Sequence, residues 1–154
     1  MLPLEGDRKP FPVIRTNFDE RDGQFSPDGR WIAYQSNESG RYEVYVQPFP
    51  GPGNKVQVSD NGGAQVRWRR DGRELFYIAL DDRLTAVPIR FAPDRAIEAG
   101  KPVPLFPTRV GGAVQARNRQ QYAVAEDGQR FLMNAMPDES TSVITVILNW
   151  KPKL

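Results

Sequence analysis

A tight-turn signal recurs three times along the chain, each time between two apolar runs. The three dipeptides are Asp28-Gly29, Asp71-Gly72 and Asp127-Gly128. Glycine adopts a positive φ without a Cβ clash, and an aspartate side chain can hydrogen-bond to its own downstream backbone. The aspartates stand 43 and 56 residues apart. A period in the forties with one such turn per unit is typical of the blades of a β-propeller.

Short β-prone runs lie on both sides of each turn, and no 11-residue window free of Gly and Pro shows a helical apolar stripe. We predict four-stranded units over residues 24–59 and 64–108, and a third unit over 119–150 that lacks its fourth strand. We expect residues 91–102 to be a long connection and residues 12–16 to be a strand. The predicted fold class is therefore all-β, with β-propeller blades of four antiparallel strands, three blades per chain, as half of a six-bladed propeller.

Composition is compatible with this prediction and removes several kinds of chemistry. A chain of 154 residues is expected to form one domain, residues 1–154, and its 13 Gly and 14 Pro are spread between apolar runs as turn residues. It has no Cys and no His, which excludes thiol chemistry, disulfides and an imidazole base. The net charge of +2 predicts no nucleic-acid partner, and the lack of a long apolar run predicts no membrane insertion. The N-terminal residues lack the pattern of a signal peptide, so we expect none.

The first unit resembles a known family. Residues 26–34, Ser-Pro-Asp-Gly-Arg-Trp-Ile-Ala-Tyr, resemble the Pro-Asp-Gly repeat of TolB-like β-propellers, although only this unit keeps the Pro. The stretch from 24 to 50 and the ending 147–150 are similar to the propeller appended to bacterial membrane-anchored serine/threonine kinases. The resemblance covers residues 11–150. It implies a propeller fold and an extracytoplasmic sensor or scaffold half of such a chain.

Catalysis by the chain itself is not expected. The sequence contains no Gly-rich phosphate loop, no His-Arg-Asp and no Asp-Phe-Gly of a kinase, and no Gly-x-Ser-x-Gly of a hydrolase. One Asp per tight turn is better explained by local backbone hydrogen bonding than by metal ligation, so we predict no metal site and no cofactor. Two function classes stay open: a non-catalytic binding module for a protein or peptide, and a metal-dependent or enzymatic propeller that acts at its central channel.

The candidate binding residues are arginines on the predicted inner strands and polar residues in a neighbouring loop. Arg suits carboxylate or phosphate ligands through its two-pronged geometry, so a ring of guanidinium groups at the channel is one hypothesis. The other is that these arginines pair with Glu20, Asp22 and Glu38 on neighbouring turns. The candidates are Arg67, Arg69, Arg117, Arg119, Asn17, Glu20 and Asp22.

Three blades do not close a ring, because known propellers have at least four. An open row of blades exposes two apolar end faces. We therefore predict a homodimer of six blades, in which residues 12–16 of each copy complete the last blade of the other. The alternative is that the missing blades belong to a longer parent chain, of which these residues are a fragment of the sensor domain.

Overall fold

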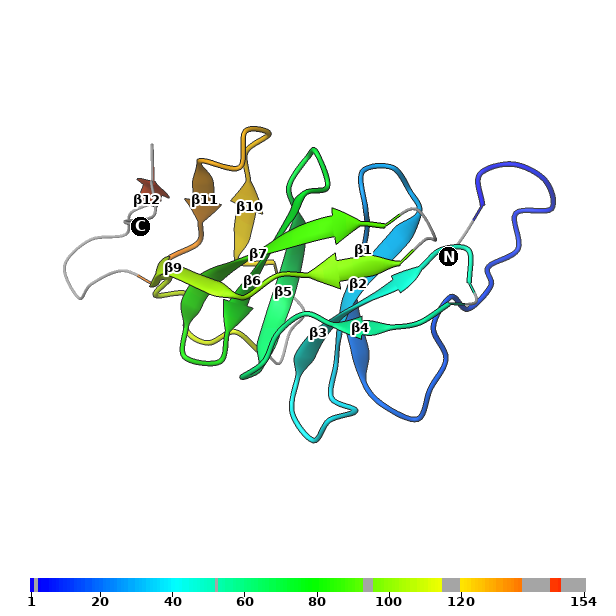
Figure 1. The fold of residues 1–154 in the computed structure, drawn as a ribbon, viewed down its shortest axis with the longest axis horizontal. Coiled ribbons are helices and arrows are strands. Elements are labelled where there is room, and N and C mark those ends of the chain that lie inside the picture. Colours follow the sequence, from blue (N-terminus) through cyan, green and yellow to red (C-terminus); the bar gives the residue numbers. More distant parts are fainter. Residues whose placement is uncertain (2, 52, 93–95, 115–119, 137–144, 148–154) are drawn as a thin grey trace.

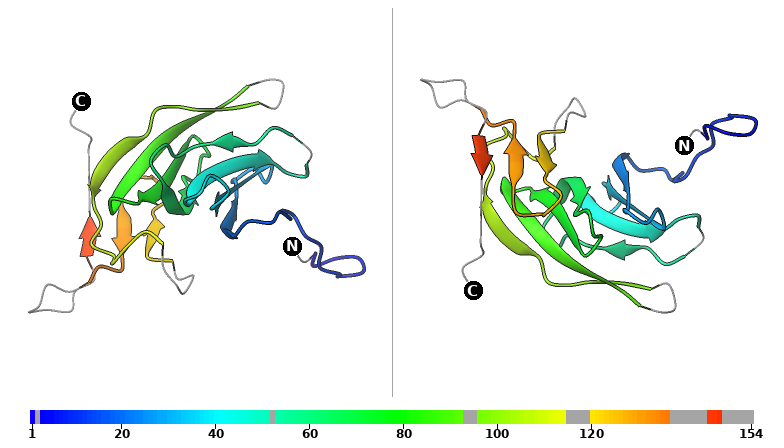
Figure 2. Two further views of the ribbon diagram at one scale, coloured as in Figure 1. Left: turned by 90° about the horizontal axis from the view of Figure 1, so that it is seen from below. Right: turned by 90° about the horizontal axis from the view of Figure 1, so that it is seen from above.

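The computed structural model describes residues 1, 3–51, 53–92, 96–114, 120–136 and 145–147. This part of the chain is all-β, with twelve strands and no helix, which confirms the predicted fold class. The strands form three antiparallel groups in a row, in chain order from one end of the molecule to the other (Figure 1). The N-terminal segment and the last strand, β12 (Thr145–Ile147), lie at opposite ends of this row in both views of Figure 2.

The first sheet has the strand order β1-β2-β3-β4, and the third has the order β10-β11-β12. The second sheet has the order β5-β6-β7-β8, and β9 pairs with β7 as well. The strands of the first sheet are β1 (Glu20–Phe25), β2 (Trp31–Ser36), β3 (Glu43–Pro48) and β4 (Val56–Gln57). Those of the second are β5 (Gly63–Trp68), β6 (Glu74–Ala79), β7 (Arg83–Phe91), β8 (Ile97–Ala99) and β9 (Val103–Pro107). Those of the third are β10 (Tyr122–Val124), β11 (Phe131–Met133) and β12 (Thr145–Ile147).

Each Asp-Gly turn joins the first two strands of a sheet in the same way. The aspartate Oδ1 accepts a hydrogen bond from the backbone N–H two residues later, and the glycine N–H donates to the carbonyl three residues earlier. The glycine φ angles are 70° at Gly29, 73° at Gly72 and 68° at Gly128. The accepted bonds are 3.1 Å at Asp28, 3.0 Å at Asp71 and 2.9 Å at Asp127. The sequence motif is therefore one backbone geometry used three times.

The cost of this geometry can be measured at Gly29, where an added Cβ would touch nothing within 4 Å. We expect Gly29→Ala to lower the free energy of unfolding by about 1–2 kcal/mol, because an L-residue is forced to φ 70°. Gly51 is the matched control, since its Cβ space is equally open and its φ is not positive. Gly51→Ala should change stability by less than about 0.5 kcal/mol in urea titrations. Equal effects of the two substitutions would contradict this account of the turn.

The second sheet is covered on both faces, as adjacent apolar residues in its strands require. Leu75 and Tyr77 of β6 face the first sheet, where they join a buried cluster with Trp31. Phe76 and Ile78 alternate with them and face the third sheet in a second cluster. Period-two alternation in one strand therefore supplies both interfaces between neighbouring sheets.

The other face of the first sheet, which we call the end face, points away from the rest of the described sheets. Ile32, Tyr34 and Tyr45 lie there, buried, with Val13 and Ile14 of the N-terminal segment packed against them. Residues 12–16 form no strand within the single chain, and their pairing with a second copy stays a prediction. Their apolar side chains cover a sheet face, which needs no backbone pairing.

The long connection predicted over residues 91–102 contains a short strand. β8 pairs antiparallel with the end of β7, with Ile89 opposite Ala99 and Phe91 opposite Ile97. β7 continues beyond its pairing with β6, which ends with Pro88 opposite Glu74, and the extension needs a partner for its backbone groups. Ile97 is buried and fixes the strand to the interface between the first two sheets.

Candidate functional site

The first strands of the three sheets, β1, β5 and β10, are the candidates for the innermost strands, those nearest the propeller axis. β5 contacts both β1 and β10. Both β1 and β5 carry a bulge, between Arg21 and Gln24 and between Ala64 and Arg67. A non-glycine residue has a positive φ at each bulge, 54° at Asp22 and 58° at Gln65. Bulges re-aim neighbouring side chains, and here they shift the register of both inner strands.

Arg67 lies immediately after the bulge of β5 and against the third sheet. Its guanidinium carbon lies 6.0 Å from the centroid of the Tyr122 ring, and its Nη1 donates to the carbonyl of Val66 at 2.9 Å. Burial lowers the pKa of Arg67, but an arginine stays charged at neutral pH. Among the described residues, no carboxylate lies within ion-pair distance of this guanidinium. Arg67 is thus a partly buried cation that lacks a direct counter-charge in the described chain.

Tyr122 of β10 is the neighbour of Arg67 in this region, and the sequence did not single it out. The residue is 4% exposed, and its hydroxyl has no hydrogen-bond partner within the described chain. Burial raises the pKa of this hydroxyl, so the group is protonated and is a hydrogen-bond donor. An unmatched buried hydroxyl beside a partly desolvated cation is uncommon in a folded domain.

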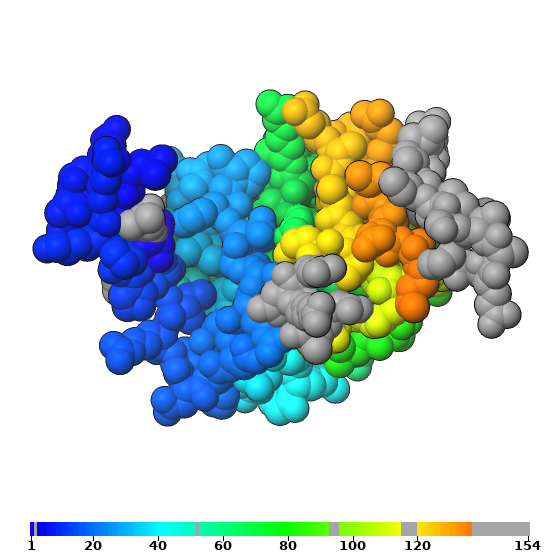
Figure 3. All heavy atoms as spheres, turned by 180° about the vertical axis from the view of Figure 1, so that it is seen from behind, coloured from blue at the N-terminus to red at the C-terminus, as the bar shows by residue number. Residues whose placement is uncertain are grey.

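Asp22 lies at the bulge of β1 on the other side of this region. Its Oδ1 accepts a hydrogen bond from Gln120 Nε2 at 2.9 Å. The segment that leads into β10 is therefore hydrogen-bonded to β1 of the first sheet. The Asp22 carboxylate also raises the pKa of Arg67 and of Tyr122, which places its charge within electrostatic range of both. Figure 3 shows this side of the molecule, where the yellow segment near residue 110 lies between the blue first sheet and the orange third sheet.

The remaining predicted site residues do not join Arg67. Arg69 lies beyond the end of β5 and forms ion pairs with Asp71 at 3.5 Å and Glu74 at 3.4 Å. Asn17 is exposed in the N-terminal segment, and Glu20 accepts a hydrogen bond from the hydroxyl of Thr16. Glu20 and Asp22 belong to β1, so the prediction that they lie in a loop is wrong. Arg117 and Arg119 lie outside the described residues.

The alternative hypothesis for the arginines, pairing with Glu20, Asp22 or Glu38, does not describe Arg69. Arg69 pairs within its own hairpin, and neighbouring Arg70 pairs with Glu126 of the next Asp-Gly turn. Glu38 pairs with Lys55.

A second polar cluster, at the start of the first sheet, is fully matched. Arg21 Nε donates to both carboxylate oxygens of Asp19 at 2.9 Å, and the Tyr42 hydroxyl donates to Asp19 Oδ2 at 2.6 Å. Hydrogen bonds from Arg21 and then from Tyr42 lower the pKa of Asp19 from 3.8 to about 2. The backbone N–H of Asp19 donates to Asn37 Oδ1 at 2.9 Å, which ties β1 to the loop after β2. Every polar group of this carboxylate is engaged, which is typical of a structural cluster.

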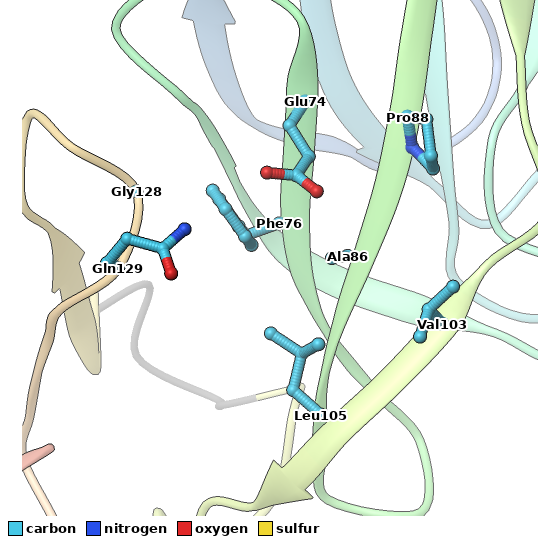
Figure 4. A pocket seen from close by; sticks show the side chains of 8 residues that line it. All are labelled: Glu74, Phe76, Ala86, Pro88, Val103, Leu105, Gly128 and Gln129. Carbon is cyan, nitrogen blue, oxygen red and sulfur yellow. The ribbon is translucent and has the colours of Figure 1, made fainter. Parts of the chain in front are cut away.

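A small hollow of about 130 Å³ lies between the second sheet and the β10–β11 turn (Figure 4). Its side chains are mainly apolar, and its carboxylate, Glu74, already pairs with Arg69. Ligand sites of ordinary size hold about 300–1,000 Å³, so this hollow is a packing gap between sheets.

The described residues contain no group of three or more Asp or Glu arranged to hold a metal ion. They also contain no helix long and apolar enough to cross a membrane.

No protein family and no curated protein matches the sequence. Two solved structures are similar in fold at low identity. One is a candidate 6-phosphogluconolactonase from Bacteroides uniformis, at 17% identity and a TM-score of 0.48, with 88% of this chain and 42% of that chain covered. The other is TolB from Acinetobacter baumannii, at 15% identity and a TM-score of 0.43, with 89% and 43% covered. This chain therefore spans less than half the length of either structure, and its description as an all-β propeller rests on its own sheets and turns.

Proposed function

We propose that the chain is a non-catalytic β-propeller module that binds a protein or peptide partner, and that two copies assemble into a six-bladed propeller. The observation that supports this proposal is the end face of the first sheet. Ile32 and Tyr34 of this face are buried against Val13 and Ile14 of the N-terminal segment, and Phe25 beside them is 47% exposed. An exposed Phe at the edge of an apolar face supports association with another protein.

The end face is also hollowed. A hollow of about 350 Å³ has an apolar part, lined by Phe25, Ile32 and Tyr34 from the sheet and by Met1, Val13 and Ile14 from the N-terminal segment, and a polar part at the start of β1, lined by residues 20–23. The space is large enough to receive side chains of another sheet. Sheets that pack face to face interdigitate their side chains in this way.

A second copy of the chain is the occupant we favour. The opposite end of the row is the third sheet, where Leu132 of β11 is 50% exposed. Two rows of three blades related by a two-fold axis bring each first sheet against the third sheet of the other copy. That arrangement covers both end faces and closes the ring at six blades.

The dimer is tested by sedimentation velocity at micromolar concentration. We expect the wild-type chain to sediment with twice the mass of one chain, and Phe25→Glu to shift it to the monomer, because a carboxylate would be buried in the interface. Phe18→Glu is the matched control, since Phe18 is 50% exposed and does not line the hollow. A well-folded wild-type monomer would rule out the dimer.

The exchange of residues 12–16 between copies is a separate prediction. Within one chain, Val13 and Ile14 pack on their own end face, so the pairing of sheets does not require an exchange. Deletion of residues 1–17 distinguishes a dimer that exchanges residues 12–16 from a dimer that does not. A stable dimer of the shortened chain would contradict the exchange and leave the dimer itself in place.

Partner binding is tested by selection of displayed random peptides on the immobilised chain. We expect one sequence motif to be enriched on the folded chain and not on the heat-denatured chain. A failure to enrich any motif, with a folded target, would count against a peptide-binding module. The resemblance of residues 24–50 to kinase-appended propellers supports an extracytoplasmic sensor role for such a module.

A further inference from the structure

We infer that Arg67 and Tyr122 form a binding site for a single carboxylate group, such as the C-terminus of a peptide. The inference rests on the proposed binding function for its natural ligand and adds the chemical group that the chain recognises. The side chains come from neighbouring inner strands, β5 and β10, with Asp22 of β1 nearby.

Arg67 provides the charge. Its described hydrogen bond uses one nitrogen, Nη1, which donates to the carbonyl of Val66. A guanidinium has five N–H donors, so most of its capacity stays available to an acceptor. Holding a charge in a partly buried place without a counter-charge costs free energy, and an anionic ligand recovers that cost when it binds. Two parallel N–H groups of a guanidinium match the two oxygens of a carboxylate.

Tyr122 provides a neutral donor beside the charge. Its hydroxyl is buried and has no acceptor in the described chain, although a Tyr hydroxyl in this position usually has one. A carboxylate held by Arg67 supplies that acceptor. Without a ligand, the unmatched hydroxyl is a cost to the fold, so its presence in a buried place favours a role in binding.

The position of Asp22 favours a ligand with a single negative charge. Its carboxylate lies within electrostatic range of Arg67 and is itself held by Gln120. Asp22 repels every negative charge that a ligand brings to Arg67, so a dianion is repelled more strongly than a monoanion. A carboxylate therefore suits this place better than a phosphate dianion.

The neighbouring Arg69 shows the contrast. Its guanidinium already has two carboxylate partners, Asp71 and Glu74, in its own hairpin. Arg69 therefore provides a matched control for the substitution of Arg67: same residue type, same strand region, but no unpaired charge.

The probe for this inference is N-acetylglycine, with N-acetylglycinamide and inorganic phosphate for comparison, titrated against the wild-type chain by NMR. We expect N-acetylglycine to shift the backbone amide signal of Tyr122 saturably at millimolar concentration, the amide to shift it little, and phosphate to bind more weakly. Arg67→Ala should weaken N-acetylglycine binding roughly tenfold or more, and Arg69→Ala should leave it unchanged.

Tyr122→Phe separates binding from structure. We expect carboxylate affinity to fall several-fold while the midpoint of urea unfolding stays the same or rises, because the substitution removes an unmatched buried hydroxyl. A loss of stability with unchanged affinity would mean that Tyr122 is only a core residue, and would overturn its role.

The outcomes distinguish this site from the proposed function. Equal binding of N-acetylglycine and its amide, or full binding by Arg67→Ala, would overturn the carboxylate site even if peptide selection succeeds elsewhere on the surface. Saturable, Arg67-dependent binding of N-acetylglycine without any enriched peptide would support the site and count against the peptide-binding function.

Discussion

Replacement of Glu43 by Ala is expected to lower the free energy of unfolding by about 2–4 kcal/mol, because two buried hydrogen-bond donors lose their acceptor. Glu43 of β3 is fully buried. One carboxylate oxygen accepts from Arg41 Nε at 2.6 Å, the other accepts from the Ser59 hydroxyl, and the backbone N–H of Gly62 donates to both at 3.0 and 2.9 Å. The carboxylate therefore fastens the segment that leads from the first sheet into the second.

Loss of this side chain leaves the Gly62 N–H without its acceptor in a buried place, and the Ser59 hydroxyl loses one too. The measurement is the urea midpoint by tryptophan fluorescence at a fixed chain concentration, because an assembling chain has a concentration-dependent stability. Glu126→Ala is the matched control, since Glu126 also pairs with an arginine but is 78% exposed. It should cost no more than about 1 kcal/mol.

Glu43→Gln provides a second measurement if Glu43→Ala does not fold. The amide keeps one acceptor oxygen but loses the charge that Arg41 contacts. We expect the free energy of unfolding of Glu43→Gln to lie between those of the wild type and of Glu43→Ala. If both Glu43 variants match Glu126→Ala, the carboxylate does not fasten the connection.

The sequence predicted the fold well where a strand lies beside a strong turn signal. Residues 74–79, just after the Asp71-Gly72 turn, form β6, as the β-prone run beside that turn predicts. The sequence was less informative where tertiary packing decides whether a segment forms a strand. The run around Val13 and Ile14 has strand-like composition but covers a sheet face, and β8 is three residues long, too short to produce a periodic pattern.

The candidate site was predicted only in part, for a reason visible in β5. Arg67 and Arg69 are two residues apart, and alternate residues of a strand share a face, so the sequence grouped them. β5 ends at Trp68, and Arg69 turns with the following hairpin toward Asp71 and Glu74. The bulge at Gln65 was also hidden, because a positive φ is expected from sequence at glycine and seldom at glutamine.

Tyr122 could not be distinguished from a core aromatic residue. It lies on a predicted inner strand and packs in the cluster between the second and third sheets. Only the unmatched hydroxyl and the nearby Arg67 give it a chemical role, and both are properties of the assembled sheets.

Replacement of Gln65 by Ala is expected to lower the free energy of unfolding by about 2–4 kcal/mol, because two buried hydrogen bonds lose their partner. The Gln65 side chain is buried at the junction of all three sheets. Its Nε2 donates to the carbonyl of Ala113 at 2.7 Å, and its Oε1 accepts from the backbone N–H of Gln121 at 2.8 Å. Its own backbone N–H donates to Gln35 Oε1 at 2.8 Å.

These bonds form one chain of amides from the first sheet to the third. Gln121 extends it, since its Oε1 accepts from Asn134 Nδ2 at 3.1 Å. Gln65→Ala keeps the backbone bond to Gln35 but removes both side-chain bonds, so the first and second sheets should stay joined while the third sheet loosens. Backbone hydrogen exchange should show this as faster exchange at Gln121, with protection in β2 and β3 retained.

Gln57→Ala is the matched control for this prediction. Its amide also donates to a backbone carbonyl, that of Ser59 at 2.8 Å, but the residue is exposed at the outer strand of the first sheet. Its loss should change stability by less than about 0.5 kcal/mol. Equal stability of the Gln65 and Gln57 variants, or unchanged exchange at Gln121, would show that apolar packing alone holds the third sheet, since Phe76 and Phe131 meet edge to face across that interface with ring centroids 5.0 Å apart.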